Sequence, residues 1–259
     1  MTEVAASERT AEPRGRVAGY WKFWGTTLWG LAIIASFAII GFGGVFGELV
    51  WLDPGPSATP EDLVAALFDH RALLLTIIAA AVAGELAILA LAVRLSGVGM
   101  QDYLGLVLPR PRDILIGLAG LVALSLAIAL IGYFFGGLQS GRVNLGMYRT
   151  ARAAGLLPVM IVAAVIVAPV MEELVFRGFL LPGWAASRLG AVGGVVLSSI
   201  VWAILHFQYD VWGIATVFCY GLWFGFVRLR SGSTLATMIL HLLQNGAAIS
   251  LIAALYSKA

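Results

Sequence analysis

The sequence predicts an all-α polytopic membrane protein, a transmembrane helix bundle with about seven spans, or eight if one re-entrant segment is counted. The composition indicates this class, because 61% of the 259 residues are hydrophobic and only 12% are charged, whereas soluble domains carry about a quarter charged residues. The mean hydropathy of +0.96 agrees. The charges also leave long uncharged runs, and about 20 apolar residues suffice for a helix to cross the hydrocarbon core.

Seven charge-poor runs predict the helices in chain order. The first is too long to be the apolar core of a cleaved signal peptide and is expected to remain as a span. The second contains one acid, Glu85. The fourth exceeds one crossing and contains Pro169, which lacks an N–H and is expected to kink the helix beside two glutamates. The runs are 23–47, 72–93, 114–136, 156–188, 191–208, 212–228 and 234–256.

Outside these runs the sequence contains few features that predict further structure. Residues 1–22 are polar and are expected to form a disordered cytoplasmic tail, followed by a single transmembrane domain at 23–259. The proline-containing segment Leu52–His70 reads as an extracytoplasmic loop, and Arg142–Arg152 as a short interfacial helix with basic residues on one side. The single cysteine, Cys219, excludes an intramolecular disulfide.

The distribution of Lys and Arg predicts a cytoplasmic N-terminus in a bacterial-type plasma (inner) membrane, because cytoplasmic loops carry an excess of these residues. In this orientation eleven lie on the cytoplasmic side and five on the other. The eleven are Arg9, Arg14, Arg16, Lys22, Arg94, Arg110, Arg112, Arg177, Arg188, Arg228 and Arg230. Aromatic residues near the span ends are expected to anchor the helices at the interfaces. They are Trp21, Trp24, Trp51, Trp184, Tyr209 and Trp212.

Polar side chains occur in three short groups inside otherwise apolar segments. On insertion scales an acid at the centre of the membrane costs roughly 2.5 to 3.5 kcal/mol, so such residues face the interior of a bundle and mark functional sites. We therefore expect one buried polar site shared by several helices. The groups are Glu172-Glu173-x-x-x-Arg177, His206 and His241-x-x-x-Asn245.

The depth of these groups predicts that they meet. If the fourth and fifth helices turn near Leu189-Gly190, Glu172 and His206 both lie about 25 Å from that turn, at 1.5 Å per residue. His241 lies roughly 15 Å beyond the next turn, again inside the membrane. The three helices are therefore expected to present these side chains to a common space.

Helical spacing suggests how the groups divide their work. Glu173 and Arg177 are four residues apart and can pair on one face. Glu172 is turned about 100° away and is left free to act. His241 and Asn245 are also four residues apart and are expected to present an imidazole and an amide to the same cavity.

The three groups, in this order and spacing, resemble the CPBP family of intramembrane proteases (CAAX-protease-and-bacteriocin-processing, or ABI), whose eukaryotic relative trims prenylated CAAX proteins. The family pattern is EExxxR, FxxxH and HxxxN or HxxxD. The sequence has EELVFR from Glu172, WAILH from Trp202, with Trp in place of Phe at a packing position, and HLLQN from His241. The resemblance covers about residues 156–250, the expected protease-like core.

The resemblance implies an intramembrane endopeptidase with defined roles. Glu172 would be the general base and His206 would help to activate water. His241 and Asn245 would stabilise the oxyanion. Three further residues are expected to support these four by fixing the helix, balancing charge or packing. They are Glu173, Arg177 and Trp202.

The cofactor is left open by the resemblance, because family members are described both as metalloproteases and as metal-independent glutamate proteases. Glu172, His206 and His241 could supply the three protein ligands of a catalytic zinc. The sequence lacks HExxH, the helical motif that presents two histidines to zinc. We favour a water activated without a cofactor, with zinc as the alternative.

The expected partners are the lipid bilayer and a membrane-anchored protein or peptide substrate, prenylated in the case of a CAAX protein; no nucleic-acid partner is expected. Two other functions use the same buried residues. One is a non-enzymatic scaffold or immunity factor. The other is a proton-coupled transporter with Glu85 in its relay, against which the absence of inverted broken-helix repeats argues.

Overall fold

The computed structural model describes residues 21–256 apart from 54, 56 and 136–140. Every regular element in this part of the chain is a helix, so the predicted all-α class is confirmed. Six of these helices are long and apolar enough to cross a membrane, and a seventh apolar helix is shorter. The predicted N-terminal tail lies outside the described residues except for its last two positions.

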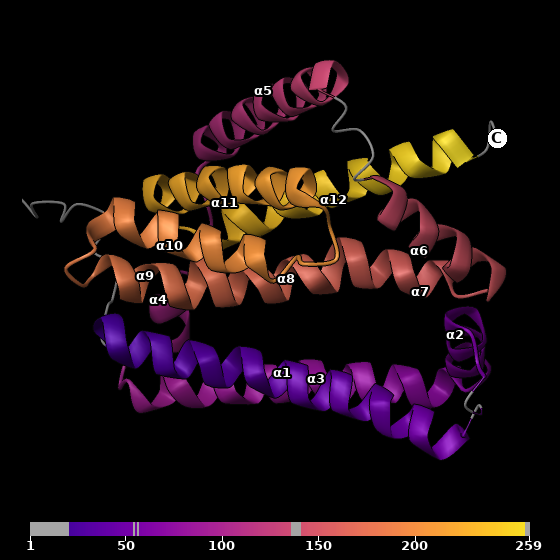
Figure 1. Cartoon of the computed structure of the whole chain (residues 1–259). Helices are drawn as coiled ribbons and strands as arrows, with labels where there is room; N and C mark the ends of the chain where they lie inside the picture. Colours follow the sequence, from indigo (N-terminus) through magenta and orange to yellow (C-terminus); the bar gives the residue numbers. More distant parts are fainter. Residues whose placement is uncertain (1–20, 54, 56, 136–140, 257–259) are drawn as a thin grey trace, which may run out of the picture.

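Helices α1 (Lys22–Leu52) and α3 (Arg71–Leu95) pack side by side and form one layer of the molecule (Figure 1). They are joined by α2 (Pro60–Asp69), so the segment predicted as a loop is partly helical. This helix begins at a capping box, in which Thr59 and Asp62 each accept a hydrogen bond from the other's backbone N–H. Such a reciprocal cap satisfies two donors that a helix start otherwise leaves unpaired.

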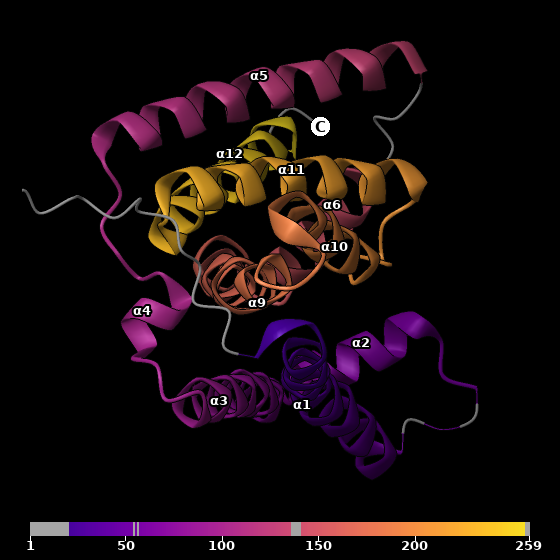
Figure 2. The same cartoon turned by 90° about the vertical axis from the view of Figure 1, so that its left-hand side faces the viewer.

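The opposite layer contains α11 (Val211–Ser231) and α12 (Thr234–Tyr256), with α5 (Pro111–Phe135) lying across their outer face (Figure 2). The short α4 (Met100–Leu104) leads from α3 to α5. Of the most apolar 18-residue segment of each helix, only 11% is buried in α1, α3 and α5, whereas 39% is buried in α11. The first three are therefore peripheral and mainly lipid-facing, whereas α11 belongs to the interior.

A single long helix, Leu157–Ala185, runs between the two layers (Figures 1 and 2). It is not uniform, because two π-helical stretches interrupt its α-helical parts. Sharp irregularity of this kind is common at functional sites, and here the stretches flank the two glutamates. In order, the parts are α7 (Leu157–Val162), η2 (Ala163–Val167), α8 (Ala168–Glu173), η3 (Leu174–Leu180) and α9 (Leu181–Ala185).

Helix α10 (Gly190–Ile204) corrects one predicted boundary, since the sequence predicted a span at 191–208. Its 15 residues reach about 22 Å, short of the roughly 30 Å hydrocarbon core. The helix ends early because Asp210 caps the start of α11, its carboxylate accepting from the N–H of Gly213 at 2.8 Å. Residues 205–210 therefore form the turn between α10 and α11, and this turn contains His206.

The helices alternate in direction, so the loops fall at two ends. The start of α1, the end of α3, α4 and α9 lie at one end, and α2, α6 (Gly141–Ala153) and the end of α12 at the other (Figure 1). The helix expected at 142–152 is thus present. Arg177 and Arg228, however, are buried inside the bundle and do not belong to the loops that orient the protein. Among the other described residues, six basic side chains still lie at the end where α1 begins and four at the opposite end. The six are Lys22, Arg94, Arg110, Arg112, Arg188 and Arg230, and the four are Arg71, Arg142, Arg149 and Arg152.

Candidate active site

A cavity of about 640 Å³ lies among α5, α6, α8, α10, α11 and α12. Residues from all three polar groups of the sequence line it, although they come from separate helices. Glu173 and Arg177 do not line it, because neither has any exposed surface. Their side chains form the wall behind it. The lining residues that the sequence predicted are Glu172, Trp202, His206, His241 and Asn245.

The two neighbouring glutamates have different surroundings. Oε1 of Glu173 accepts a hydrogen bond from Nη1 of Arg177 and another from Nδ1 of His241, each at 3.0 Å. The side chain of Glu172 is 27% exposed and faces the cavity. Consecutive helical residues point about 100° apart, so one acid enters a buried ion pair while the other is presented to the cavity. The i,i+4 pair of Glu173 and Arg177 is present as predicted.

Trp202 makes the direct contact with Glu172. Its indole Nε1–H donates to Oε2 of Glu172 at 2.6 Å, and the guanidinium of Arg177 lies 4.3 Å from the centre of its ring. The indole thus binds a carboxylate with its edge and a cation with its face. The prediction that this residue serves only packing is incomplete, because a Phe at this position has no N–H to donate. A tryptophan in an apolar run was the available signal, since a buried indole N–H usually has a partner.

The ring of His206 is held by the helix end that precedes it. Nδ1 lies 2.8 Å from the backbone carbonyl oxygen of Trp202. A carbonyl oxygen can only accept, so Nδ1 carries the proton and Nε2 of the neutral ring carries the lone pair. The imidazole also stacks on Tyr209, with ring centres 5.9 Å apart. These contacts present a basic nitrogen to the cavity from the turn after α10.

His241 bridges the two glutamates. Because Nδ1 donates to the carboxylate of Glu173, the nitrogen on the cavity side is Nε2, which lies 4.0 Å from Oε2 of Glu172. A carboxylate that binds one ring nitrogen fixes the orientation of the imidazole and the tautomer. The sequence did not predict this contact, since His241 and Glu173 are on different helices.

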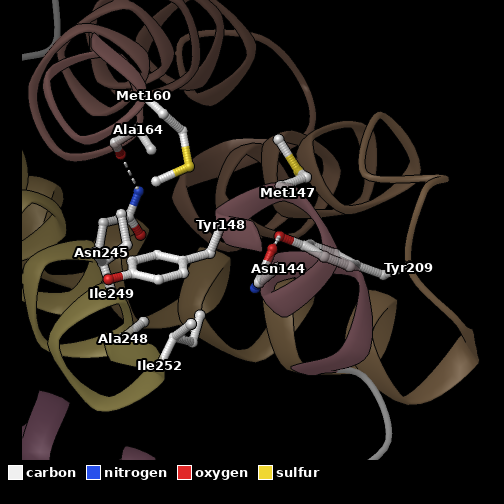
Figure 3. A pocket seen from close by; sticks show the side chains of 10 residues that line it. All are labelled: Asn144, Met147, Tyr148, Met160, Ala164, Tyr209, Asn245, Ala248, Ile249 and Ile252. Atoms are coloured by element: carbon white, nitrogen blue, oxygen red, sulfur yellow. Dashed lines mark hydrogen bonds between the residues drawn. The ribbon is translucent and has the colours of Figure 1, made fainter. Parts of the chain in front are cut away.

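Asn245 lies one turn further along α12 and reaches back to the central helix. Its Nδ2 donates to the backbone carbonyl of Ala164 at 2.8 Å (Figure 3). The amide has two N–H donors, of which this bond uses one. A side chamber of about 110 Å³ extends the cavity beyond Asn245, lined by apolar groups that include Met147 and Met160 (Figure 3).

Tyr209, which the sequence predicted only as an interface anchor, also lines the site. It lines both the cavity and the side chamber, and its hydroxyl donates to Oδ1 of Asn144 on α6 at 2.9 Å (Figure 3). Burial raises the pKa of this phenol above its usual value, so it remains a donor. Trp184, another expected interface anchor, is buried, and its indole N–H donates to Oγ1 of Thr27 at 2.9 Å.

The proposed zinc ligands do not form a metal-binding group. Glu172 and His241 approach within 4.0 Å, but across the described residues no three His, Cys, Asp or Glu side chains are arranged to hold a metal ion. Glu85 of α3 does not line the cavity, although it is close enough to Glu172 for the two carboxylates to repel each other. The site therefore presents one carboxylate, two imidazole Nε2 atoms and an amide to a common space.

Comparison with known proteins adds one finding. Residues 154–247 match the family model described as type II CAAX prenyl endopeptidase Rce1-like. The matched segment begins just before the central helix, runs through α10 and α11, and ends within α12, so it contains every predicted site residue. No curated protein and no solved structure matches the chain significantly.

Proposed function

We propose that this integral membrane protein is an intramembrane endopeptidase that hydrolyses a peptide bond in a membrane-tethered protein or peptide. The match of residues 154–247 to the Rce1-like CAAX prenyl endopeptidase model supports the proposal. The observation that carries the proposal is the convergence of three distant polar groups on one cavity. Peptide hydrolysis requires a base beside a water molecule and donors aimed at the developing oxyanion.

Glu172 is the proposed general base. The indole N–H of Trp202 holds its Oε2 at 2.6 Å, which leaves Oε1 to take a proton from a water molecule in the cavity. Nε2 of His206 accepts a hydrogen bond from the same water and orients it. The resulting hydroxide attacks the scissile carbonyl carbon, and the proton on Glu172 then passes to the leaving amide nitrogen as the C–N bond breaks.

His241 and Asn245 are the proposed oxyanion donors. His241, anchored through Nδ1 to Glu173, can carry a second proton on Nε2 and donate it toward the cavity. Asn245 holds its amide in place with one N–H on Ala164 and has a second N–H for the oxyanion. Donors fixed before the reaction need no reorganisation, and in a water-poor cavity each is worth more than in solvent.

Water activation is proposed to occur without a metal ion, because the sequence lacks the HExxH motif that presents two histidines to zinc. If zinc does bind, Glu172, His206 and His241 would hold it and it would polarise the attacking water. Transport has less support, because Glu85 stands outside the cavity lining.

The proposed orientation has the N-terminus in the cytoplasm of a bacterial-type cell, which places α2 and α6 at the extracytoplasmic end. A cysteine at the exposed position 70 between α2 and α3 (His70→Cys, with Cys219→Ser) should react with an impermeant maleimide added to intact cells. Labelling only in inverted vesicles would reverse the orientation.

The substrate class is tested with protein purified into liposomes. A prenylated CAAX peptide, the same peptide without its prenyl chain, and single-span membrane proteins are compared as substrates. Cleavage that requires a membrane anchor supports the proposal. Failure of every anchored substrate, with folded protein, would refute it.

A further inference from the structure

The first π-helical stretch of the central helix ends at a backbone carbonyl without a helical donor. In η2 the N–H of Ala168 donates to the carbonyl of Ala163, five residues back. In the same register, the N–H of residue 169 would donate to the carbonyl of Ala164, five residues back. Residue 169 is proline and has no N–H. The carbonyl of Ala164 therefore needs a donor from elsewhere.

The second stretch repeats this arrangement. At the end of η3 the N–H of Leu181 donates to the carbonyl of Phe176, again five residues back. The next donor would be residue 182, for the carbonyl of Arg177, and residue 182 is also proline. Each stretch is thus followed by a proline. Because that proline has no N–H, the carbonyl five residues before it receives no hydrogen bond from within the helix.

Side chains of the neighbouring helices supply the two missing donors. Asn245 of α12 donates to the carbonyl of Ala164 at 2.8 Å (Figure 3). Arg228 of α11 donates through Nε to the carbonyl of Arg177 at 3.1 Å. A buried carbonyl with no partner is costly in a bundle that excludes water, so these two bonds are needed where they occur.

Arg228 is built into this position. It is 5% exposed, and the loop after α4 lies directly over its guanidinium. A Cβ at Gly105 would collide with Nη2, and the positive φ of 65° also favours glycine there. The carbonyl of Gly105 in turn accepts from the N–H of Thr234 at 2.9 Å. The loop, Arg228 and the central helix are thus locked together.

We propose that Arg228 and Asn245 are positioning residues that replace the N–H groups missing at Pro182 and Pro169. The two supported carbonyls bracket Glu172 and Glu173 in the sequence. A π-helical turn holds one residue more than an α-helical turn. If the π register were lost, the part of the helix on one side of the stretch would rotate by about 100° relative to the part on the other side. The two bonds therefore fix the angle at which one acid faces the cavity and the other faces Arg177 and His241.

The experiment tests whether a second substitution restores what the first one removes. Its activity measurements rest on the proposed peptidase function. Arg228→Met keeps an unbranched stem but removes the donor, and kcat should fall about 10-fold to 100-fold, as for a small misplacement of the reacting groups, with little change in KM. Adding Pro182→Ala returns a backbone N–H and should restore kcat to within about threefold of wild type. Arg230→Met, on the same helix but at a half-exposed position paired with Asp113, is the control and should change little.

A second arm does not depend on catalysis. Melting temperature and hydrogen exchange of amides 174–181 are measured for the same variants in a Glu172→Gln background. Arg228→Met should lower the melting temperature and speed exchange, and Pro182→Ala should reverse both. A double variant no better than Arg228→Met in these measurements would overturn the proposal, even if the wild type is a peptidase. A wild type without activity would refute only the peptidase function.

Asn245 allows the matching test at the other proline. Asn245→Leu should lower both stability and kcat, because the amide serves the carbonyl of Ala164 and the oxyanion. Pro169→Ala should then restore the melting temperature without restoring kcat. Equal recovery of the melting temperature and kcat would refute the oxyanion role of Asn245 and support its positioning role. Recovery of neither quantity would refute the positioning role at Pro169.

Discussion

Trp202 occupies the position of Phe in the FxxxH pattern that the sequence resembles, and the exchange adds a hydrogen bond to the carboxylate of the proposed base. Trp202→Phe keeps an aromatic face for Arg177 but removes the indole N–H. A hydrogen bond to a charged group contributes about 1.5–3 kcal/mol, so we expect kcat to fall on the order of tenfold and the melting temperature to fall modestly. Trp202→Ala, which also removes the ring, should lower both. Full activity of Trp202→Phe would show that the indole bond is unimportant for catalysis.

Glu173 should matter mainly for stability. Its carboxylate is the partner of both Arg177 and His241 in a region without exposed surface. Removing one member of a buried ion pair leaves an uncompensated charge and costs about 3–5 kcal/mol. Glu173→Gln should therefore lower the melting temperature strongly, whereas Glu172→Gln should not. Similar melting temperatures for the two variants would contradict this division between the acids.

Local spacing explains which contacts the sequence could predict. Glu173 and Arg177 are on one helix, so their i,i+4 pairing followed from helical geometry alone. The contacts of Glu173 with His241 and of Glu172 with Trp202 join different helices. They depend on how the helices rotate and pack, which spacing along one helix does not determine.

At the scale of elements, the sequence predicted seven spans, and six of them lie close to helices long enough to cross the membrane, whereas the span predicted at 191–208 corresponds to the shorter α10. It predicted a kink at Pro169, but not the π-helical stretches. The π register is stabilised by donors from other helices, Asn245 and Arg228, and such donors are invisible in the local pattern. The early end of α10 was also missed, although Asp210 is a standard residue for a helix start.

The turn between α10 and α11 can be tested through this cap. Asp210→Ala removes the acceptor for the N–H of Gly213 and should destabilise the protein by about 0.5–2 kcal/mol. Because the same turn positions His206, kcat/KM should fall as well. Asp210→Asn keeps a capping oxygen and should behave nearly as wild type. Equal behaviour of the two variants would show that the cap does not position the turn.

At the scale of the whole molecule, the peripheral helices α1, α3 and α5 face outward while the central helix, α11 and α12 carry the polar site. Composition and charge spacing were enough to predict this bundle, because the membrane constrains every span in the same way. The depth of the polar groups predicted that they share a cavity. The role of α6 and Tyr209 in closing that cavity could not be predicted, since it depends on contacts between loops and helices far apart in the sequence.

The proposed mechanism, in which Glu172 activates water directly, predicts that activity does not depend on a metal ion. If Glu172 activates water directly, protein treated with a chelator should keep its activity and contain far less than one zinc per chain. A stoichiometric metal whose removal abolishes turnover, and whose return restores it, would show that Glu172, His206 and His241 act as ligands. The peptidase function would survive that result, but the direct mechanism would not.

The central claim is that Glu172 activates the water that cleaves a membrane-anchored peptide. The most direct test compares wild type and Glu172→Gln in metal-depleted liposomes, with the new peptide ends identified by mass spectrometry. Loss of a general base costs about 10² to 10⁴-fold, so we expect cleavage at one bond by the wild type and a loss of this size in the variant, with an unchanged melting temperature. Cleavage at the wild-type rate by folded Glu172→Gln would contradict the account.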